Sequence, residues 1–372
     1  MNKKLWVAAF TLTGSIIGAG ILGLPYVFSK IGLGVGLAYL LFLGLAMMLV
    51  YLYLGEVALS VKSNHQLPGY AEKFLGKKGK MLMIIVMLFA VHSSLLAYLL
   101  GVGKSLSAMF FGNYIYTIIF SILFWILMSS LLKGGLKELK KAEPYGVLAI
   151  ALIILIIFFI FGSRIDISNL TFFDSSFIFL PIGVIIFAFL GFTTIPILKT
   201  ELKGNEKLLK KAIIIGVTIP IVLYSLFVFT VVGFMGREVA EIVTLTVGLG
   251  PIANILGIFT MFTSYLVMSF SIFDMYKYDL KLTSGTSYLL SIAVPILLFL
   301  LISFLGVKSF ISILGFGGVI SGGCIGIMIL LMNYKAKKTR KSKPAYSLPI
   351  NIPIMILISL IFIAAVILQL FF

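Results

Sequence analysis

The stretch Gly14-Ser15-Ile16-Ile17-Gly18-Ala19-Gly20-Ile21-Leu22-Gly23-Leu24-Pro25 places four glycines and a proline in an apolar segment long enough to cross a lipid bilayer. In a helix interior a glycine costs on the order of 1 kcal/mol relative to alanine, and a proline about 3 kcal/mol. Backbone groups freed by a helix break are tolerated in a membrane only where protein or a polar cavity satisfies them. Such freed carbonyl and N–H groups can hold a ligand, so the stretch predicts an interrupted membrane helix of the kind found in transporters.

The composition of the whole chain is that of an all-α polytopic membrane protein. Of 372 residues, 61% are hydrophobic and 11% are charged, whereas roughly a quarter are charged in a typical soluble domain. The mean hydropathy is +1.20. We expect one transporter domain over residues 1–372 with about eleven spans, at 5–29, 32–60, 81–110, 114–132, 145–163, 175–198, 212–235, 251–275, 285–304, 308–333 and 350–371.

The positive charge is distributed unevenly between the two ends of these spans. The net charge is +17, and 24 of the 29 Lys and Arg residues fall on one side of the expected topology. The five on the other side are Lys30, Lys104, Arg164, Arg237 and Lys308. This asymmetry predicts a cytoplasmic N-terminus and an outer C-terminus. We expect the protein to lie in the plasma membrane. The basic loops at 133–141, 199–211 and 335–343 are interpreted as topology signals, so no nucleic-acid partner is expected.

A second interruption falls in the span 175–198. Residues 187–196 read Phe-Ala-Phe-Leu-Gly-Phe-Thr-Thr-Ile-Pro, with a glycine, two hydroxyls and a proline at mid-span. The two interrupted spans are five apart and therefore cross the membrane in opposite directions. Glycines also serve close helix packing, but paired breaks favour an inverted-repeat binding site. We expect repeat one at about 5–163, repeat two at about 175–333, and an additional helix at about 350–371.

Residues 16–26, Ile-Ile-Gly-Ala-Gly-Ile-Leu-Gly-Leu-Pro-Tyr, resemble the helix 1 signature of the amino acid/auxin permease family and its bacterial aromatic and hydroxy amino acid relatives. Supporting matches are Gly55-Glu56, Pro68-Gly69-Tyr70, Leu75-Gly76, Ala97-Tyr98-Leu99, Phe189-Leu190-Gly191-Phe192, Thr263-Ser264 and Phe273-Asp274. These families are part of the amino acid–polyamine–organocation superfamily. The resemblance implies a LeuT-type 5+5 inverted repeat and secondary active transport of amino acids by alternating access.

A free amino acid needs partners for both its ammonium and its carboxylate group in one dry pocket. A broken helix supplies both, because carbonyls at the end of its first half suit the ammonium and N–H groups at the start of its second half suit the carboxylate. The candidate substrate-binding residues are Ser15, Gly18, Ala19, Gly20, Phe187, Ala188, Leu190 and Gly191, with Ser94 and Tyr98 beside the substrate side chain. By resemblance, Phe187 is the aromatic residue that covers the substrate from outside.

Three hydroxyl residues in the span 251–275 suggest a site for the coupling ion. Thr260, Thr263 and Ser264 share one helix face because they are three and four residues apart. Hydroxyl and carbonyl oxygens are hard ligands suited to Na⁺. The LeuT-type fold implies an ion site between this span and the first, and the matching carbonyls are those of Gly14 and Ile17. The alternative is that each hydroxyl bonds back to a carbonyl of its own helix.

Coupling to protons is the alternative to Na⁺ symport, and no other cofactor is expected. Some relatives carry a lysine in the fifth span, but the segment 149–157 has none. His92 lies within a predicted span, where a buried imidazole titrates near neutral pH or serves as a packing residue. Glu56 and Asp274 lie near the predicted cytoplasmic ends of their spans, as gate residues or interfacial charges.

Other functional classes fit these residues less well. The chain has no His-Glu-x-x-His motif and no Cys/His cluster, and Ser321 in the glycine-rich stretch 315–323 has no histidine partner in a plausible span. An enzyme is therefore not expected, and the absence of a filter loop argues against a channel. The remaining alternatives are a carrier of another small organic solute and a nutrient sensor built on a transporter fold. No residue pattern fixes the oligomeric state or the amino acid that is bound.

Overall fold

The computed structural model describes residues 3–63, 65–133, 136–243, 247–306, 309–339 and 344–371, without the side chains of 136–144, 247 and 369–371. Lys308 and parts of the basic loops 133–141 and 335–343 lie outside the described residues. Within the described ranges, every regular element is helical.

The principal helices follow one another along the chain with short connections. They are α1 (Lys3–Ile16), α2 (Gly20–Ile31), α3 (Leu33–Leu59), α4 (Leu67–Phe111), α5 (Thr117–Lys133), α6 (Leu136–Phe161), α7 (Ser168–Thr171), α8 (Leu180–Ala188), α9 (Ile195–Glu201), α10 (Leu209–Met235), α11 (Gly250–Asp274), α12 (Ser284–Phe304), α13 (Phe310–Thr339) and α14 (Ile352–Phe371). A 3₁₀ turn, η3 (Phe192–Thr194), precedes α9, and a π turn, η8 (Met275–Asp279), follows α11.

Apolar helices lie at each of the predicted spans. Eight of the described helical segments are long and apolar enough to cross a membrane, and the bent pair α1 and α2 raises this to nine. The segments Thr117–Lys133 and Ile352–Leu368 are shorter apolar helices at two further predicted positions. The described part of the chain therefore has the helices of a polytopic membrane protein.

The start of α4 differs most from the prediction, and α6 also begins early, at Leu136 instead of 145. α4 begins at Leu67, well before the expected start at 81. Its first turns carry Glu72 and Lys73, which kept them out of a hydropathy-based span. Gly76 has φ +77°, a conformation that glycine adopts readily, and the apolar part of α4 begins beyond it, after Lys80.

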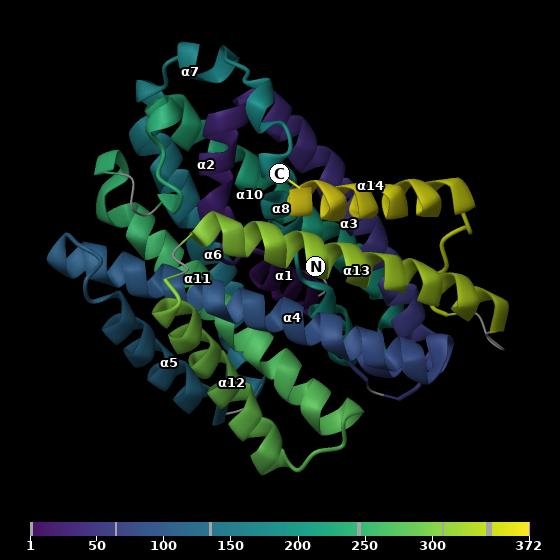
Figure 1. The fold of residues 1–372 in the computed structure, drawn as a ribbon. Helices are drawn as coiled ribbons and strands as arrows, with labels where there is room; N and C mark the ends of the chain where they lie inside the picture. Colours follow the sequence, from purple (N-terminus) through teal and green to yellow (C-terminus); the bar gives the residue numbers. More distant parts are fainter. Residues whose placement is uncertain are drawn as a thin grey trace.

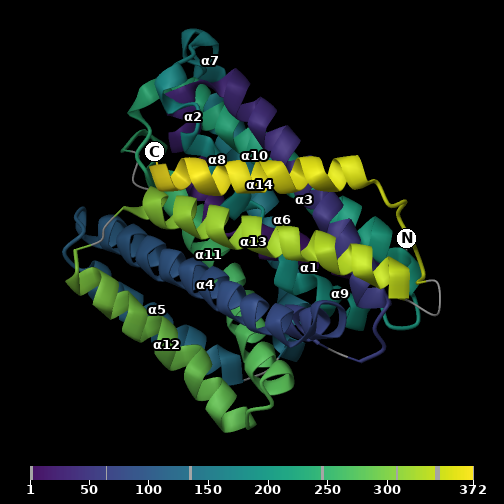
Figure 2. The same cartoon turned by 45° about the vertical axis from the view of Figure 1, so that its right-hand side comes forward.

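The helices form a bundle around α1 and α8. Figure 1 shows α4, α13 and α14 side by side, with α5 and α12 beyond α4. The same order persists when the molecule is turned (Figure 2). Of the 18 most apolar consecutive residues in the segment Leu180–Glu201, 89% are buried, whereas the corresponding share in Ser284–Phe304 is 28%. The two interrupted segments thus lie at the centre, and α12 presents apolar side chains outward, as a lipid-facing helix does.

Candidate substrate and ion site

The first interruption lies where the sequence predicts it. α1 ends at Ile16, α2 begins at Gly20, and the two axes differ by 56°. Between them the chain turns tightly, because the Gly18 N–H donates to the Ile16 carbonyl at 2.9 Å. Pro25 lies inside α2 and does not end it. The prediction that the first half ends near residues 16–18 and the second begins near 19–20 is confirmed.

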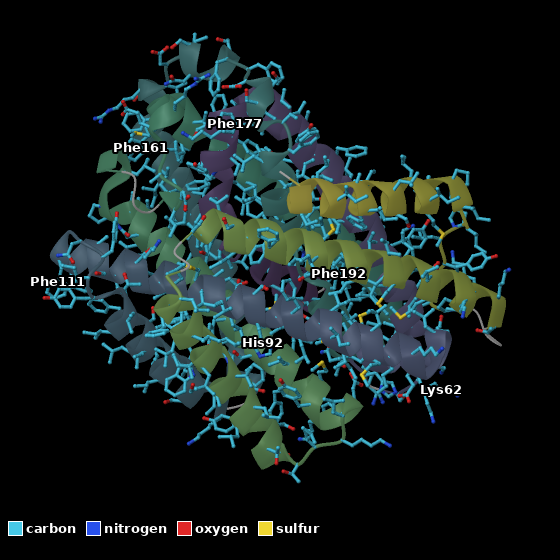
Figure 3. All side chains as sticks on the ribbon, viewed as in Figure 1. Lys62, His92, Phe111, Phe161, Phe177 and Phe192 are labelled. Atoms are coloured by element: carbon cyan, nitrogen blue, oxygen red, sulfur yellow. The ribbon has the colours of Figure 1, made fainter. Side chains whose placement is uncertain are left out.

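The second interruption also follows the prediction. α8 ends at Ala188 and the 3₁₀ turn η3 begins at Phe192, which Figure 3 labels. The Leu190 N–H donates to the Phe187 carbonyl at 2.9 Å, so the helix ends in a tight turn. Gly191 follows with an extended φ of −159°.

The structure brings the two interruptions into direct contact. Gly20 lies so close to Ala188 that a Cβ atom at position 20 would overlap the Ala188 backbone. On the other side of the breaks, a Cβ atom at Gly191 would lie 2.9 Å from Cγ1 of Ile16. The absence of side chains at these glycines is what permits the approach.

A buried side-chain hydrogen bond also joins the interrupted segments. The Thr194 hydroxyl lies 2.6 Å from the Ser15 hydroxyl, and both residues are buried. Ser15, predicted to bind substrate, therefore contacts η3 in this conformation. Thr194 was not predicted as a site residue, because a hydroxyl at mid-span does not by itself show which partner it meets.

Two tyrosines at the breaks were missed in the sequence analysis. The Tyr224 hydroxyl, from α10, lies 2.9 Å from the carbonyl oxygens of both Ile16 and Ala188. The Tyr51 hydroxyl, from α3, donates to the Phe189 carbonyl. Each lies in an apolar helix and has no exposed surface. The sequence does contain a signal that could have identified them: a tyrosine within an apolar helix has a hydroxyl that needs a hydrogen-bond partner when it is buried.

Tyr98 and Ser94 lie on the side of α4 that faces the first break. A Cβ atom at Gly18 would lie 2.7 Å from the Tyr98 hydroxyl and 3.0 Å from the Ser264 hydroxyl. Ser94 donates to the Ala90 carbonyl of its own helix at 3.0 Å. Tyr98, predicted to lie beside the substrate side chain, thus lies next to Gly18, whereas the Ser94 hydroxyl is engaged within α4.

A small cavity lies next to the second break. A cavity of about 20 Å³ is lined by Ser94, Gly191, Thr193 and residues of α11 and α13. That volume holds about one water molecule and is too small for an amino acid. An amino acid would fit at this point only if the helices that line the cavity were further apart.

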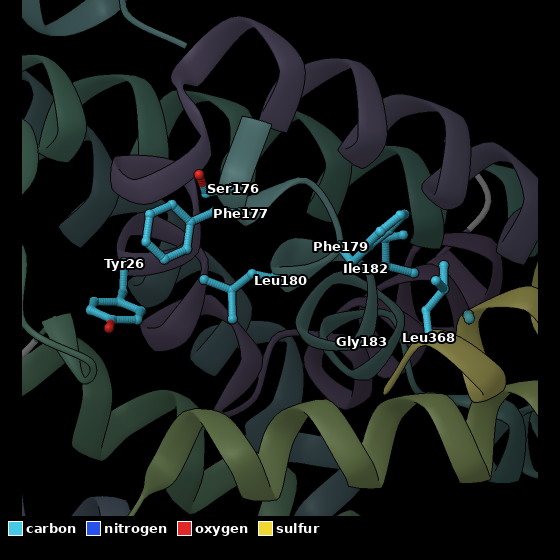
Figure 4. Close-up of a pocket in the computed structure, with 9 residues that line it drawn as sticks. Tyr26, Ser176, Phe177, Phe179, Leu180, Ile182, Gly183 and Leu368 are labelled. Atoms are coloured by element: carbon cyan, nitrogen blue, oxygen red, sulfur yellow. The ribbon is translucent and has the colours of Figure 1, made fainter. Parts of the chain in front are cut away.

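A larger pocket opens beyond α2 and α8, at the ends remote from the two breaks. It has a volume of about 360 Å³, and its aromatic lining includes Tyr26, Phe177 and Phe179 (Figure 4). Gly183, which also lines it, lies one helical turn before Phe187. Phe187 is buried, and a Cβ atom at Gly317 of α13 would lie 3.2 Å from its ring. Phe187 therefore lies between this pocket and the second break.

The predicted ion ligands are brought together only in part. The Ser264 hydroxyl of α11 lies 3.1 Å from the Gly14 carbonyl oxygen and 3.2 Å from the Ile17 carbonyl oxygen. Thr260 instead bonds to the Gly257 carbonyl at 3.0 Å, within α11. Thr263 bonds to the carbonyls of Phe259 and Thr260 in the same helix. The Ser264 hydroxyl and the carbonyls of Gly14 and Ile17 therefore lie close together, whereas the two threonines bond to carbonyls of their own helix, as in the alternative interpretation.

The predicted proton or gate residues lie away from this cluster. Nδ1 of His92, in the middle of α4 (Figure 3), lies 2.7 Å from the Leu88 carbonyl of the same helix. His92 and Ser94 are two residues apart and so point to nearly opposite sides of α4. Asp274 ends α11, ten residues after Ser264, which places it roughly 15 Å further along the helix.

Glu56 belongs to a separate buried network at the end of α3. Its carboxylate lies 3.2 Å from the Lys337 amine of α13 and accepts hydrogen bonds from the Ser347 hydroxyl at 2.7 Å and the Leu348 N–H at 3.2 Å. The Asn333 amide lies 3.3 Å from the same carboxylate. These contacts attach the connection between α13 and α14 to α3.

Comparison with known proteins identifies the family to which the chain belongs. A sequence model of the tryptophan/tyrosine permease family matches residues 1–369. The chain belongs to this permease family. It is 25% identical over 337 residues to glutamine transporter 2 of Aliivibrio fischeri, covering 86% of each chain. It is 24% identical over 373 residues to tyrosine-specific transport system 1 of Haemophilus influenzae, covering 92% of this chain and 91% of the relative.

A plant protein is also similar over part of its length. The permease is 28% identical over 255 residues to amino acid transporter ANT1 of Arabidopsis thaliana, covering 62% of this chain and 56% of the relative. The family and these relatives show that the chain is a permease and not an enzyme, as expected. The family match and the apolar helices of the chain together identify a multi-pass membrane protein. The predicted kinship with bacterial aromatic amino acid permeases is confirmed, and the link to auxin permeases stays a prediction.

Proposed function

We propose that this permease is a secondary active transporter that moves amino acids across the plasma membrane by alternating access, coupled to Na⁺. The observation that carries the proposal is the direct contact of two interrupted helices at the centre of the bundle. The relatives named as glutamine and tyrosine transporters support an amino acid as the substrate.

The two breaks offer partners for both charged groups of an amino acid. The first N–H groups of α2 have no acceptor within their own helix, and the positive end of its dipole favours a carboxylate. The ends of α1 and α8 present carbonyl oxygens. The Ala188 carbonyl accepts the Tyr224 hydroxyl and has a second lone pair with which to accept an ammonium proton.

Sodium coupling is supported by the oxygens around Ser264. Its hydroxyl and the carbonyls of Gly14 and Ile17 belong to different helices, so a cation held among them would join α11 to α1. Oxygen donors of this kind are the ligands of hard cations. Binding would replace the present hydrogen bonds of the Ser264 hydroxyl.

Proton coupling is the alternative, and one observation favours it. Nε2 of His92 is buried and has no hydrogen-bond partner among the described residues. An unpaired ring nitrogen is available for a proton. We place this alternative second because His92 does not face the cluster at the breaks.

The inverted repeat stays part of the proposal. The two interruptions lie at corresponding places in the predicted repeats, 5–163 and 175–333, and α14 corresponds to the additional helix. The cytoplasmic N-terminus and outer C-terminus rest on the distribution of Lys and Arg. In that orientation the aromatic pocket at Tyr26 opens to the outside.

The proposal is tested by uptake of radiolabelled tyrosine, tryptophan and glutamine into proteoliposomes under an inward Na⁺ gradient or an inward proton gradient. We expect uptake driven by Na⁺, and we expect Ser264→Ala to lose this stimulation. The control is Ser271→Ala, since among the described residues the Ser271 hydroxyl bonds to the Val267 carbonyl of its own helix, at 2.9 Å.

Each other outcome rejects a defined part of the proposal. Uptake driven by protons alone rejects sodium coupling and directs attention to His92, Glu56 and Asp274. Sodium-driven uptake that Ser264→Ala leaves intact rejects the ion site. No uptake of any amino acid under either gradient rejects the substrate class.

A further inference from the structure

Tyr224, in the middle of α10, is hydrogen-bonded to both helix breaks at once. Its hydroxyl oxygen lies 2.9 Å from the carbonyl oxygen of Ile16, the last residue of α1, and 2.9 Å from that of Ala188, the last residue of α8. The side chain has no exposed surface. A tyrosine hydroxyl has one proton to donate, so the two carbonyls share a single donor.

Two negative helix ends meet at this hydroxyl. The C-terminal end of a helix carries a partial negative charge, because its last carbonyls have no N–H partner within the helix. α1 and α8 both end with carbonyls directed at the same buried hydroxyl, where the low local dielectric screens their repulsion only weakly. The shared proton of Tyr224 is attractive to both carbonyls and offsets that repulsion.

We propose that Tyr224 is a positioning residue that fastens the two interrupted helices to each other and so keeps their glycines at the spacing the substrate requires. This role rests on the proposed function, because it describes how the same site is held in shape. Gly20 and Ala188 lie against each other directly next to the Tyr224 hydroxyl bonds, so a change in one break is transmitted to the other.

Tyr51 provides an internal comparison. Its hydroxyl donates to the Phe189 carbonyl, and its ring packs edge-on against Phe192 with a centroid distance of 4.9 Å. Both partners belong to the second break. Tyr51 therefore supports one interruption, whereas Tyr224 holds both.

The test compares three variants that each remove one hydroxyl and keep the ring. They are Tyr224→Phe, Tyr51→Phe and Tyr288→Phe. Tyr288 is the matched control, because its hydroxyl also donates to a main-chain carbonyl of another helix, that of Ser129 at 2.9 Å, away from the breaks. Hydrogen–deuterium exchange is measured on the full chain in detergent, for peptides that cover residues 17–20 and 189–191.

We expect Tyr224→Phe to speed exchange at both breaks by about five-fold, the size that follows from losing one hydrogen bond. Tyr51→Phe should speed exchange only at residues 189–191, and Tyr288→Phe at neither segment. Faster exchange at a single break in Tyr224→Phe, or no change at all, overturns the inference. This readout does not depend on transport, so it stands even if the proposed substrate is wrong.

Uptake measurements then test the consequence for the substrate. In Tyr224→Phe we expect KM for the transported amino acid to rise several-fold, with a smaller change in the maximal rate per folded molecule. Tyr288→Phe should match the unsubstituted protein in both. An unchanged KM in Tyr224→Phe, while the unsubstituted protein transports, overturns the positioning role. Absence of transport by the unsubstituted protein counts against the proposed function. The hydrogen–deuterium exchange result then tests the role of Tyr224 by itself.

Discussion

Gly20 lies directly against Ala188, so that the first residue of α2 and the last residue of α8 are in direct contact. The contact involves backbone atoms on the Ala188 side, and backbone atoms cannot swing aside as a long side chain can. Glycine is therefore the residue that this position requires.

Gly20→Ala should strongly reduce uptake. The added methyl group would overlap the Ala188 backbone, and overpacking of a tight contact costs about 1–3 kcal/mol. We expect the rate of amino acid uptake to fall by about tenfold or more, with normal membrane insertion. The control is Gly34→Ala, because no atom lies within 4 Å of a Cβ placed at Gly34. Uptake that is equal in the two variants would contradict the assigned contact.

The bond between Thr194 and Ser15 predicts a specific pattern of non-additive effects. The two hydroxyls are 2.6 Å apart, and the substitutions Ser15→Ala and Thr194→Val each remove this bond. We expect both single variants to slow uptake, and the double variant to be no slower than the worse single variant. Thr230→Val is a suitable control, since Thr230 is buried and bonds to the Leu226 carbonyl of its own helix at 2.8 Å. Additive losses in the double variant would argue for independent roles.

The buried pair of Glu56 and Lys337 should matter for stability. Lys337→Met removes the amine that lies 3.2 Å from the buried Glu56 carboxylate, and removing one partner of a buried pair costs about 3–5 kcal/mol. Thermal unfolding in detergent should show a lower midpoint for Lys337→Met than for the double variant with Glu56→Gln. A double variant that is less stable than Lys337→Met alone would contradict this account.

His92→Leu should keep uptake at every pH tested. The ring bonds through Nδ1 to the Leu88 carbonyl of its own helix and contacts neither break in the described hydrogen bonds. We expect the pH dependence of uptake to match that of the unsubstituted protein, apart from a modest loss of stability. A pH profile that flattens in His92→Leu would support proton coupling in place of Na⁺ coupling.

The two interruptions were predictable because glycine and proline act locally. Gly18, Gly20 and Gly191 weaken a helix wherever it lies, so the breaks follow from the residues themselves. The carbonyl oxygens of Gly14 and Ile17 at Ser264 required the resemblance to a known fold as well. Their approach was expected on that basis, and the structure brings these oxygens together.

The side chains that hold the breaks depend on contacts between distant parts of the chain. Tyr224 lies 208 residues from Ile16, and Thr194 lies 179 residues from Ser15. Helix periodicity does not reveal which helix faces which at that distance. Thr260 and Thr263 show the same limit from the other direction: their spacing placed them correctly on one face of α11, but they bond within that helix.

The small volume of the cavity at the second break, about 20 Å³, bears on how the proposed site would distinguish one amino acid from another. A preformed pocket for the substrate side chain would discriminate between amino acids by fit alone. If an amino acid binds at this break as proposed, room for its side chain has to come from movement of α4, α11 and α13, which line the cavity, away from residues 190–193. Discrimination would then depend on how far each amino acid holds those helices apart, and we expect a bulkier residue in the cavity lining to shift the preference towards smaller amino acids.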